Sequence, residues 1–352
     1  VERGVGLQTS VTVPDLQPHT QYEVRLQACL RNVLNGCGTS SGVLVTTDED
    51  IPLGLMPPTL TAVASDAVHI AWKPPTQANG VITRYRIYQQ QQDIANSEIL
   101  INQVTGSVLE FLHSGQDLRP FQVYEYRVVA VNSKGEVTSN YSSVRTLESV
   151  PAGFSAPGVN NVSTYGVAVG WAPPVSPNGI ITEYRILYQG NAAGSSAIQQ
   201  SVSVPGNRTN TSLSGLEAYS TYTLYMEAAN GAGSVQSPSV TFTTREGYPS
   251  GLSDFAVEKV NTGTSVILSW DAPKKPNGVI TTYRVYQSPY SVAIYSGTAR
   301  SFEFRRLSPY TEYLVKLEAC TRVGCTLGKE QSFYTAEIAP SSQPSPTFGT
   351  VN

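Results

Sequence analysis

The feature that most constrains this chain is a motif that recurs about every 100 residues. The segments "ANGVITRYRIYQ", "PNGIITEYRILYQ" and "PNGVITTYRVYQ" begin at Ala78, Pro177 and Pro276. A Trp precedes each of them, and the three Trp residues are 99 residues apart: Trp72, Trp171 and Trp270. Repeats of this length carry their own hydrophobic core, unlike solenoid repeats of roughly 20 to 50 residues. We therefore expect a tandem array of separate domains.

A second motif places a Tyr six residues after a Leu, as in "LRPFQVY" and "LSPYTEY". Apolar and polar residues alternate after this Tyr, as in "YTLYMEA" and "YLVKLEA", which is typical of antiparallel strands with one buried face. Such strands predict an all-β sandwich. The four copies of the motif end at Tyr22, Tyr124, Tyr222 and Tyr313.

Together these motifs resemble the fibronectin type III family. The resemblance implies tandem immunoglobulin-like sandwiches of seven strands, arranged in an extended row. It places the three Trp residues on strand B as core, and the four Tyr residues at the start of strand F as tyrosine corners. An Asn-Gly dipeptide alone would predict a two-residue hairpin, but the Pro-rich lead-in blocks ladder pairing. We interpret "PNG" as a structural turn between the two sheets, with a binding motif as the alternative.

The motifs predict three complete domains and two partial ones. Residues 1–48 are expected to be the C-terminal part of a domain, because they lack the Trp and "PNG" segments. Residues 337–352 are expected to be a linker and the start of a further domain. The complete domains are 52–148, 151–245 and 249–336. Short linkers with Pro52, Pro151 and Pro249 favour a semi-rigid spacer.

The four Cys residues form two close pairs in the sequence. The pairs are compatible with disulfides, free thiols or a metal site, but zinc lacks two further ligands in either domain. We favour disulfides that clamp the loop after strand F, which implies an oxidising, extracellular setting. The alternation points Cys29 and Cys320 away from the core. The pairs are Cys29 with Cys37 and Cys320 with Cys325.

The sequence contains four potential N-glycosylation motifs. Their number is close to what the Asn, Ser and Thr content gives by chance, so they mark where sugars could attach without indicating secretion. The candidate residues are Asn140, Asn161, Asn207 and Asn210.

Charge and motif content argue against several functions. The net charge of −3 gives no basic surface for nucleic acid. Neither a nucleophile with a nearby base nor a phosphate loop can be assembled, so we predict no enzyme activity and no cofactor. The three His residues are scattered. The acidic run at residues 48–50 is interpreted as a solvated linker, with a calcium site as the alternative.

Within the family, "EACTRVGC" combined with "PNGVITTYRVYQ" resembles a very large ectodomain of sensory hair cells and photoreceptors. This resemblance implies a structural and adhesive spacer in an extracellular glycoprotein. It further implies fibrous links at stereocilia and the photoreceptor periciliary membrane, needed for hearing and vision. Implied partners are collagen IV and an adhesion receptor of the ankle-link complex, at sites not identifiable here, with membrane attachment outside this segment. The alternatives are the ligand-binding ectodomain of a signalling receptor such as a receptor phosphatase, and an intracellular muscle-type array.

Overall fold

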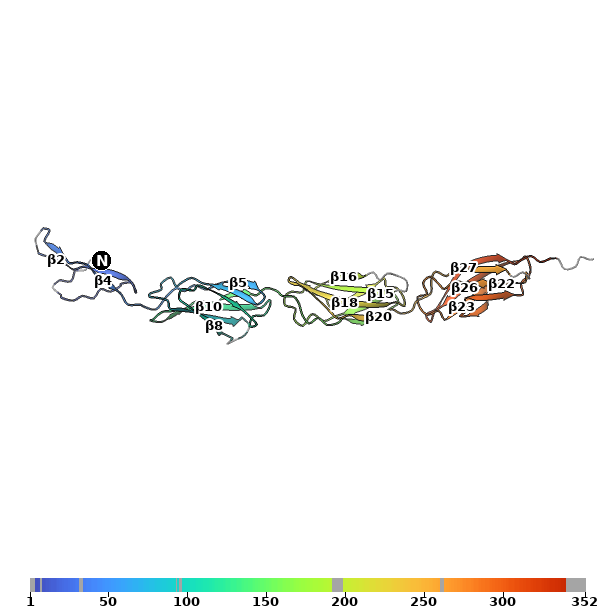
Figure 1. Ribbon diagram of the computed structural model, residues 1–352, viewed down its shortest axis with the longest axis horizontal. Coiled ribbons are helices and arrows are strands. Elements are labelled where there is room, and N and C mark those ends of the chain that lie inside the picture. The colour runs from blue at the N-terminus through green and yellow to red at the C-terminus, as the bar shows by residue number, and fades with distance from the viewer. Residues whose placement is uncertain are drawn as a thin grey trace, which may run out of the picture. The chain divides into compact units, whose positions relative to one another are not determined.

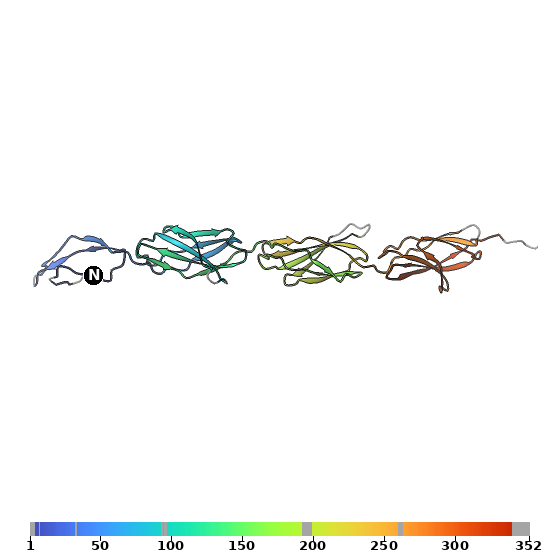
Figure 2. The same ribbon diagram turned by 90° about the horizontal axis from the view of Figure 1, so that it is seen from below.

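The computed structural model describes residues 4–6, 8–31, 34–92, 94, 97–191, 199–259 and 263–339. Every regular element in these ranges is a β-strand. The strands fall into four sequential groups, here called the first to fourth repeats and distinguished by colour in Figures 1 and 2. By internal contacts the chain divides into two compact units: residues 1–152 with 176–180 and 230–233, and residues 153–175 with 181–229 and 234–352.

The second repeat is a sandwich of two antiparallel sheets. One sheet has the order β5-β6-β9, formed by Thr59–Ala64, Ala67–Ala71 and Glu110–Ser114. The other has the order β11-β10-β7-β8, with β12 also paired to β10; the strands β7, β8, β10, β11 and β12 span Arg84–Gln91, Ile99–Thr105, Val123–Val131, Glu136–Thr138 and Ser142–Arg145. Because β11 and β12 are two pieces of one edge strand on β10, the repeat has the seven strands expected.

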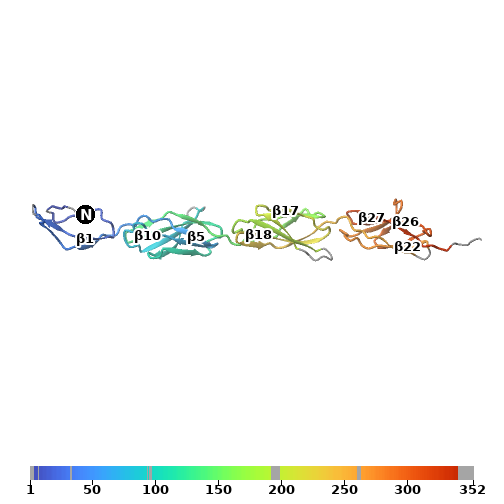
Figure 3. The same ribbon diagram turned by 90° about the horizontal axis from the view of Figure 1, so that it is seen from above.

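The third and fourth repeats have the same topology. In the third, β13-β14-β17 (Gly158–Asn160, Gly166–Gly170, Asn210–Ser214) faces β16-β15-β18-β19 with β20 (Gln200–Pro205, Glu183–Asn191, Thr221–Asn230, Gly233–Gln236, Val240–Thr243). In the fourth, β21-β22-β25 (Ala256–Lys259, Ser265–Ser269, Ser301–Arg305) faces β24-β23-β26-β27 (Ala293–Gly297, Thr282–Gln287, Glu312–Cys320, Cys325–Tyr334). Figure 3 labels strands of both sheets in these repeats: β17 and β18 in the third, and β22, β26 and β27 in the fourth.

The first repeat consists of one broken hairpin in the described residues. It pairs β1 (Gln21–Val24) with β4 (Val43–Thr46), and β2 (Gln27–Cys29) with β3 (Cys37–Thr39). These pairs correspond to the last two strands of the other repeats. Their apolar side chains, including Val24, Leu26 and Val43, are exposed. The predicted segment beyond residue 339 lies outside the described residues.

Each complete repeat has its own core around the predicted Trp. The Trp rings meet a Tyr of the third strand edge-on, with ring centroids 5.5, 5.3 and 5.8 Å apart for Trp72–Tyr85, Trp171–Tyr184 and Trp270–Tyr283. All three Trp side chains are buried. Each Trp follows the second strand directly instead of lying within it, because the Pro-rich segment begins there.

The Tyr at the start of the sixth strand is fixed by the same hydrogen bond in all four repeats. Its hydroxyl accepts from the backbone N–H five residues earlier, at 2.8 to 2.9 Å. Tyr124 and Tyr222 are buried, whereas Tyr22 and Tyr313 are half-buried. In the described ranges no helix is long and apolar enough to cross a membrane.

Candidate linker-binding site

The three linkers that precede the complete repeats share a Glu three residues before a Pro. They read "EDIP", "ESVP" and "EGYP" and begin at Glu49, Glu148 and Glu246. Each Glu side chain binds next to the Asn-Gly dipeptide of the repeat that follows it. We call this arrangement the linker clasp: the linker Glu, the Asn-Gly dipeptide and one polar residue of the loop after the sixth strand.

The Glu carboxylate accepts a backbone hydrogen bond and occupies the space above the Gly. At the first linker, the N–H of Val81 donates to Glu49 at 2.8 Å. A Cβ on Gly80 would lie 2.6 Å from Cδ of Glu49. A side chain at this position would displace the carboxylate, and the φ of +159° at Gly80 also favours Gly. The equivalent bonds are Ile180 to Glu148 at 2.8 Å above Gly179, and Val279 to Glu246 at 3.1 Å above Gly278.

The Asn of the dipeptide binds the linker backbone twice. Asn79 has φ of 50°, in the left-handed region that Asn tolerates better than most residues. Its Nδ2 donates to the carbonyl of Ile51 at 2.8 Å, and its own carbonyl accepts from the N–H of Asp50 at 2.8 Å. The same pair of bonds joins Asn178 to Val150 and Ser149 at 2.8 and 3.0 Å, and Asn277 to Tyr248 and Gly247 at 2.7 and 2.7 Å.

The loop after the sixth strand supplies the third part of the clasp. Asn132 donates from Nδ2 to the carbonyl of Asp50 at 2.7 Å. Its Oδ1 accepts from the N–H groups of Lys134 and Gly135, which fixes the loop. The side chain of Ile51 lies against Gly135, where a Cβ would be 3.0 Å away. The equivalent donors are Asn230 to Ser149 at 2.7 Å and Thr321 to Gly247 at 2.9 Å.

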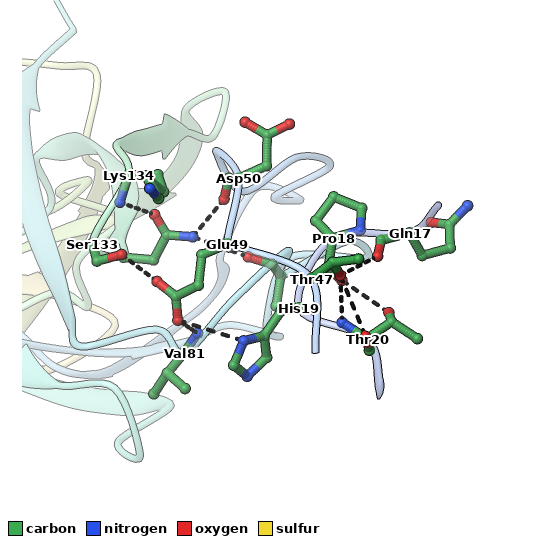
Figure 4. A network of polar contacts seen from close by, with 12 residues as sticks. Gln17, Pro18, His19, Thr20, Thr47, Glu49, Asp50, Val81, Ser133 and Lys134 are labelled. Carbon is green, nitrogen blue, oxygen red and sulfur yellow. Dashed lines mark hydrogen bonds and ion pairs between the residues drawn. The ribbon is translucent and has the colours of Figure 1, made fainter. Parts of the chain in front are cut away.

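Figure 4 shows two further contacts at the first linker. The hydroxyl of Ser133 donates to the Glu49 carboxylate, and Nδ1 of His19 lies 3.9 Å from it. The bonds from Ser133 and from the N–H of Val81 hold the pKa of Glu49 below its usual value. With its side chain only 18% exposed, Glu49 is not the solvated linker residue expected. The interpretation was wrong for this residue because its partners lie on two distant loops.

The residue before each linker Glu is bonded to the preceding repeat. The carbonyl of Asp48 accepts from the N–H of His19 at 2.9 Å, that of Leu147 from Phe121 at 3.1 Å, and that of Arg245 from Tyr219 at 3.1 Å. At each linker, therefore, one residue bonds to the preceding repeat and the next bonds to the following repeat.

The clasp satisfies the linker carboxylates with N–H and O–H donors, so its geometry needs no cation. In the described part of the chain, the group of potential metal-binding side chains is Glu318, Cys320 and Cys325. Because both sulfurs are in a disulfide, they offer no thiolate ligand.

Both Cys pairs form disulfides in the structure. Cys29 joins Cys37 and Cys320 joins Cys325, each across the first pair of residues after the loop tip, with Cα atoms 3.9 and 4.0 Å apart. Cys320 is not part of the core cluster, yet it is 4% exposed. It is covered because Nη1 of Arg284 lies 3.7 Å from both sulfurs. The expectation that Cys320 points away from the core is therefore corrected in one respect: the side chain is buried and does not face solvent.

All four candidate glycosylation residues are exposed. Asn140 lies in the break between β11 and β12, Asn161 follows β13, Asn207 lies in the turn between β16 and β17, and Asn210 begins β17. Their modification remains a prediction.

The linker clasp was not predicted from the sequence, although a signal was present. Glu148 lies 99 residues after Glu49, and Glu246 lies 98 residues after Glu148, so the spacing is nearly that of the Trp residues. The "PNG" segment was interpreted as a structural turn. The structure gives it a binding role as well, with the chain's own linker as the ligand.

Tandem seven-strand sandwiches, each with a Trp core and a tyrosine corner, define a class of modular repeat proteins. Residues 56–145, 151–245 and 249–335 each match the family Fibronectin type III domain. The chain belongs to the fibronectin type III family, and the predicted fold class is confirmed.

The chain is also similar to individual members of this family. Usherin of Rattus norvegicus is 42% identical over 99% of this chain, and usherin of Homo sapiens is 41% identical over 99%. Phosphatidylinositol phosphatase PTPRQ of Homo sapiens is 29% identical over 97%. The chain spans only 7% of the length of these two usherins and 14% of that phosphatase. The predicted resemblance to a large ectodomain is thereby confirmed as similarity to usherin, and the chain is a non-catalytic spacer segment of extracellular type.

Proposed function

We propose that this segment is a structural and adhesive spacer of a large extracellular protein that forms fibrous links in sensory cells. The links would join membranes, or membrane and matrix, at hair-cell stereocilia and the photoreceptor periciliary membrane. The similarity to usherin over nearly the whole chain supports this proposal.

The linker clasp is the structural observation that carries the proposal. A spacer transmits position only if its linkers restrict the motion of successive domains. Here the restriction is built from backbone and side-chain bonds at three successive linkers. The two disulfides suit an oxidising, extracellular setting.

Contacts with collagen IV and with an adhesion receptor are proposed for the whole protein, through regions other than the clasps. The clasp surfaces are occupied by the chain's own linkers, and so are not free for a partner. The membrane attachment is proposed to lie outside this segment.

The experiment that tests the proposal is immunogold electron microscopy with antibodies raised against this segment. Gold particles on the fibrous links of stereocilia and at the periciliary membrane are the expected result. Gold confined to the cytoplasm, or to membranes without links, would contradict it.

The ectodomain of a signalling receptor is the second candidate, favoured by the similarity to a phosphatase over 97% of the chain. Its identity to this chain is lower than that of usherin, 29% against 42%. A segment-specific antibody that detects a phosphatase domain in the same full-length polypeptide would favour this candidate.

A further inference from the structure

The chain contains five Asn-Gly dipeptides, and four of them lie in linker clasps. Three are the dipeptides that bind the linkers, and the fourth, Asn230-Gly231, contributes to the second clasp from the end of β18. The fifth, Asn35-Gly36, lies near the exposed hairpin tip of the first repeat. The five Asn residues are Asn35, Asn79, Asn178, Asn230 and Asn277.

An Asn-Gly dipeptide can lose ammonia by a reaction within the chain. The backbone nitrogen of the Gly attacks the side-chain carbonyl carbon of the Asn, so that a new C–N bond closes a succinimide ring. The bond to Nδ2 breaks and ammonia leaves. Water then opens the ring at either carbonyl to give aspartate or isoaspartate. Gly favours the reaction because it has no Cβ to hinder ring closure.

At Asn178 the clasp opposes the conformation in which the backbone nitrogen of Gly179 can attack the side-chain carbonyl carbon. Its Nδ2 is bonded to the carbonyl of Val150 at 2.8 Å, which fixes the side chain. Its own carbonyl, which belongs to the peptide group with Gly179, accepts from Ser149 at 3.0 Å. The next amide, that of Ile180, is bonded to Glu148. Rotation into the ring-closing conformation therefore requires release of the linker.

Asn230 is held still more directly by the same Glu. The N–H of Gly231, the group that would attack, donates to Glu148 at 2.7 Å. The Asn230 side chain donates to the carbonyls of Ser149 and Pro177 at 2.7 and 3.0 Å. By contrast, the side chain of Asn35 is exposed and has no hydrogen bond to any described residue.

We propose that the linker clasp controls deamidation at these Asn-Gly sites, and that deamidation in turn keeps the clasp open. An aspartate at position 178 has no N–H to donate to Val150. It also brings a second negative charge towards the site where Glu148 binds. Isoaspartate in addition lengthens the backbone by one carbon. Both products, aspartate and isoaspartate, lack the hydrogen bond from position 178 to Val150 that the linker needs in order to bind again.

The test is peptide mapping of the intact 352-residue chain during incubation in mildly alkaline buffer. The rate at each Asn-Gly site is compared with the rate of the same site in the denatured chain. The expected protection is near onefold for Asn35 and about tenfold or more for the clasp residues. Equal rates at Asn35 and Asn178, each relative to the denatured chain, would overturn the proposal.

Two variants make the test specific to one clasp. Glu148→Ala should accelerate deamidation of Asn178 and Asn230 and leave Asn277 unchanged, whereas Glu246→Ala should accelerate Asn277 alone. Glu148→Gln, which keeps the side-chain shape, provides a second variant if the first fails to fold. Unchanged rates at Asn178 in both variants would refute control by the clasp.

Asn178→Asp tests the second half of the proposal. Hydrogen exchange at the amide of Ile180 should accelerate about tenfold in this variant. An Ile180 amide that stays as protected as in the wild type would show that deamidation does not open the clasp.

Discussion

The third repeat offers a direct test of why the dipeptide contains Gly. A Cβ on Gly179 would lie 2.6 Å from Cδ of Glu148 and 2.8 Å from Nδ2 of Asn230. The backbone of Gly179 is not in the left-handed region, so Ala is opposed by these neighbours and not by its own conformation. Gly179→Ala should therefore displace the Glu148 carboxylate.

The magnitude follows from the bonds that Glu148 makes. It accepts from the N–H of Ile180 at 2.8 Å and of Gly231 at 2.7 Å. For a half-buried carboxylate each such bond contributes about 1 kcal/mol. Glu148→Ala and Gly179→Ala should each lower the free energy of clasp closure by about 2 kcal/mol, which is roughly a 30-fold loss of amide protection.

The assay is hydrogen exchange at Ile180 and Gly231 in the intact chain, in a double-mutant cycle. Because both substitutions remove the same two bonds, the double variant should lie within about 1 kcal/mol of Glu148→Ala alone. Gly158→Ala is the matched control, since its nearest neighbour is an ordinary 3.6 Å from the added Cβ. Additive effects, or an unchanged exchange rate in Gly179→Ala, would refute the argument.

Three further predictions concern the repeats themselves. Burial lowers the pKa of His113, so unfolding takes up a proton, and the second repeat should lose stability as the pH falls below about 6.5; calorimetry should find this loss abolished in His113→Gln and retained in His69→Gln. Trp171→Ala should destabilise the third repeat by about 3 to 5 kcal/mol, and an unchanged melting curve would contradict its place in the core. Replacing Cys320 and Cys325 by Ala should destabilise the fourth repeat by about 2 to 3 kcal/mol and leave the melting of the other repeats unchanged.

The fold could be predicted because its signals repeat within short segments. The spacing of Trp72, Trp171 and Trp270 and the alternation after Tyr124 determine which side chains face a core, and both are visible in the sequence. Three cores in the structure contain these Trp residues.

The linker clasp could not be predicted in the same way. The Glu49 site joins a linker to Val81 and Ser133, which are 32 and 84 residues away. Strand alternation likewise gives the direction of Cys320 but not its burial, because the covering side chain, Arg284, comes from a neighbouring strand. Contacts of this kind depend on which loops the topology brings together.

Small-angle X-ray scattering tests most directly the proposal that the clasped linkers restrict the motion of successive repeats. The wild-type chain is compared with a variant in which Glu49, Glu148 and Glu246 are all replaced by Ala. We expect a broader distance distribution for the variant, with each complete repeat still folded, and no response of the wild type to a calcium chelator. Superimposable scattering curves for wild type and variant would contradict it.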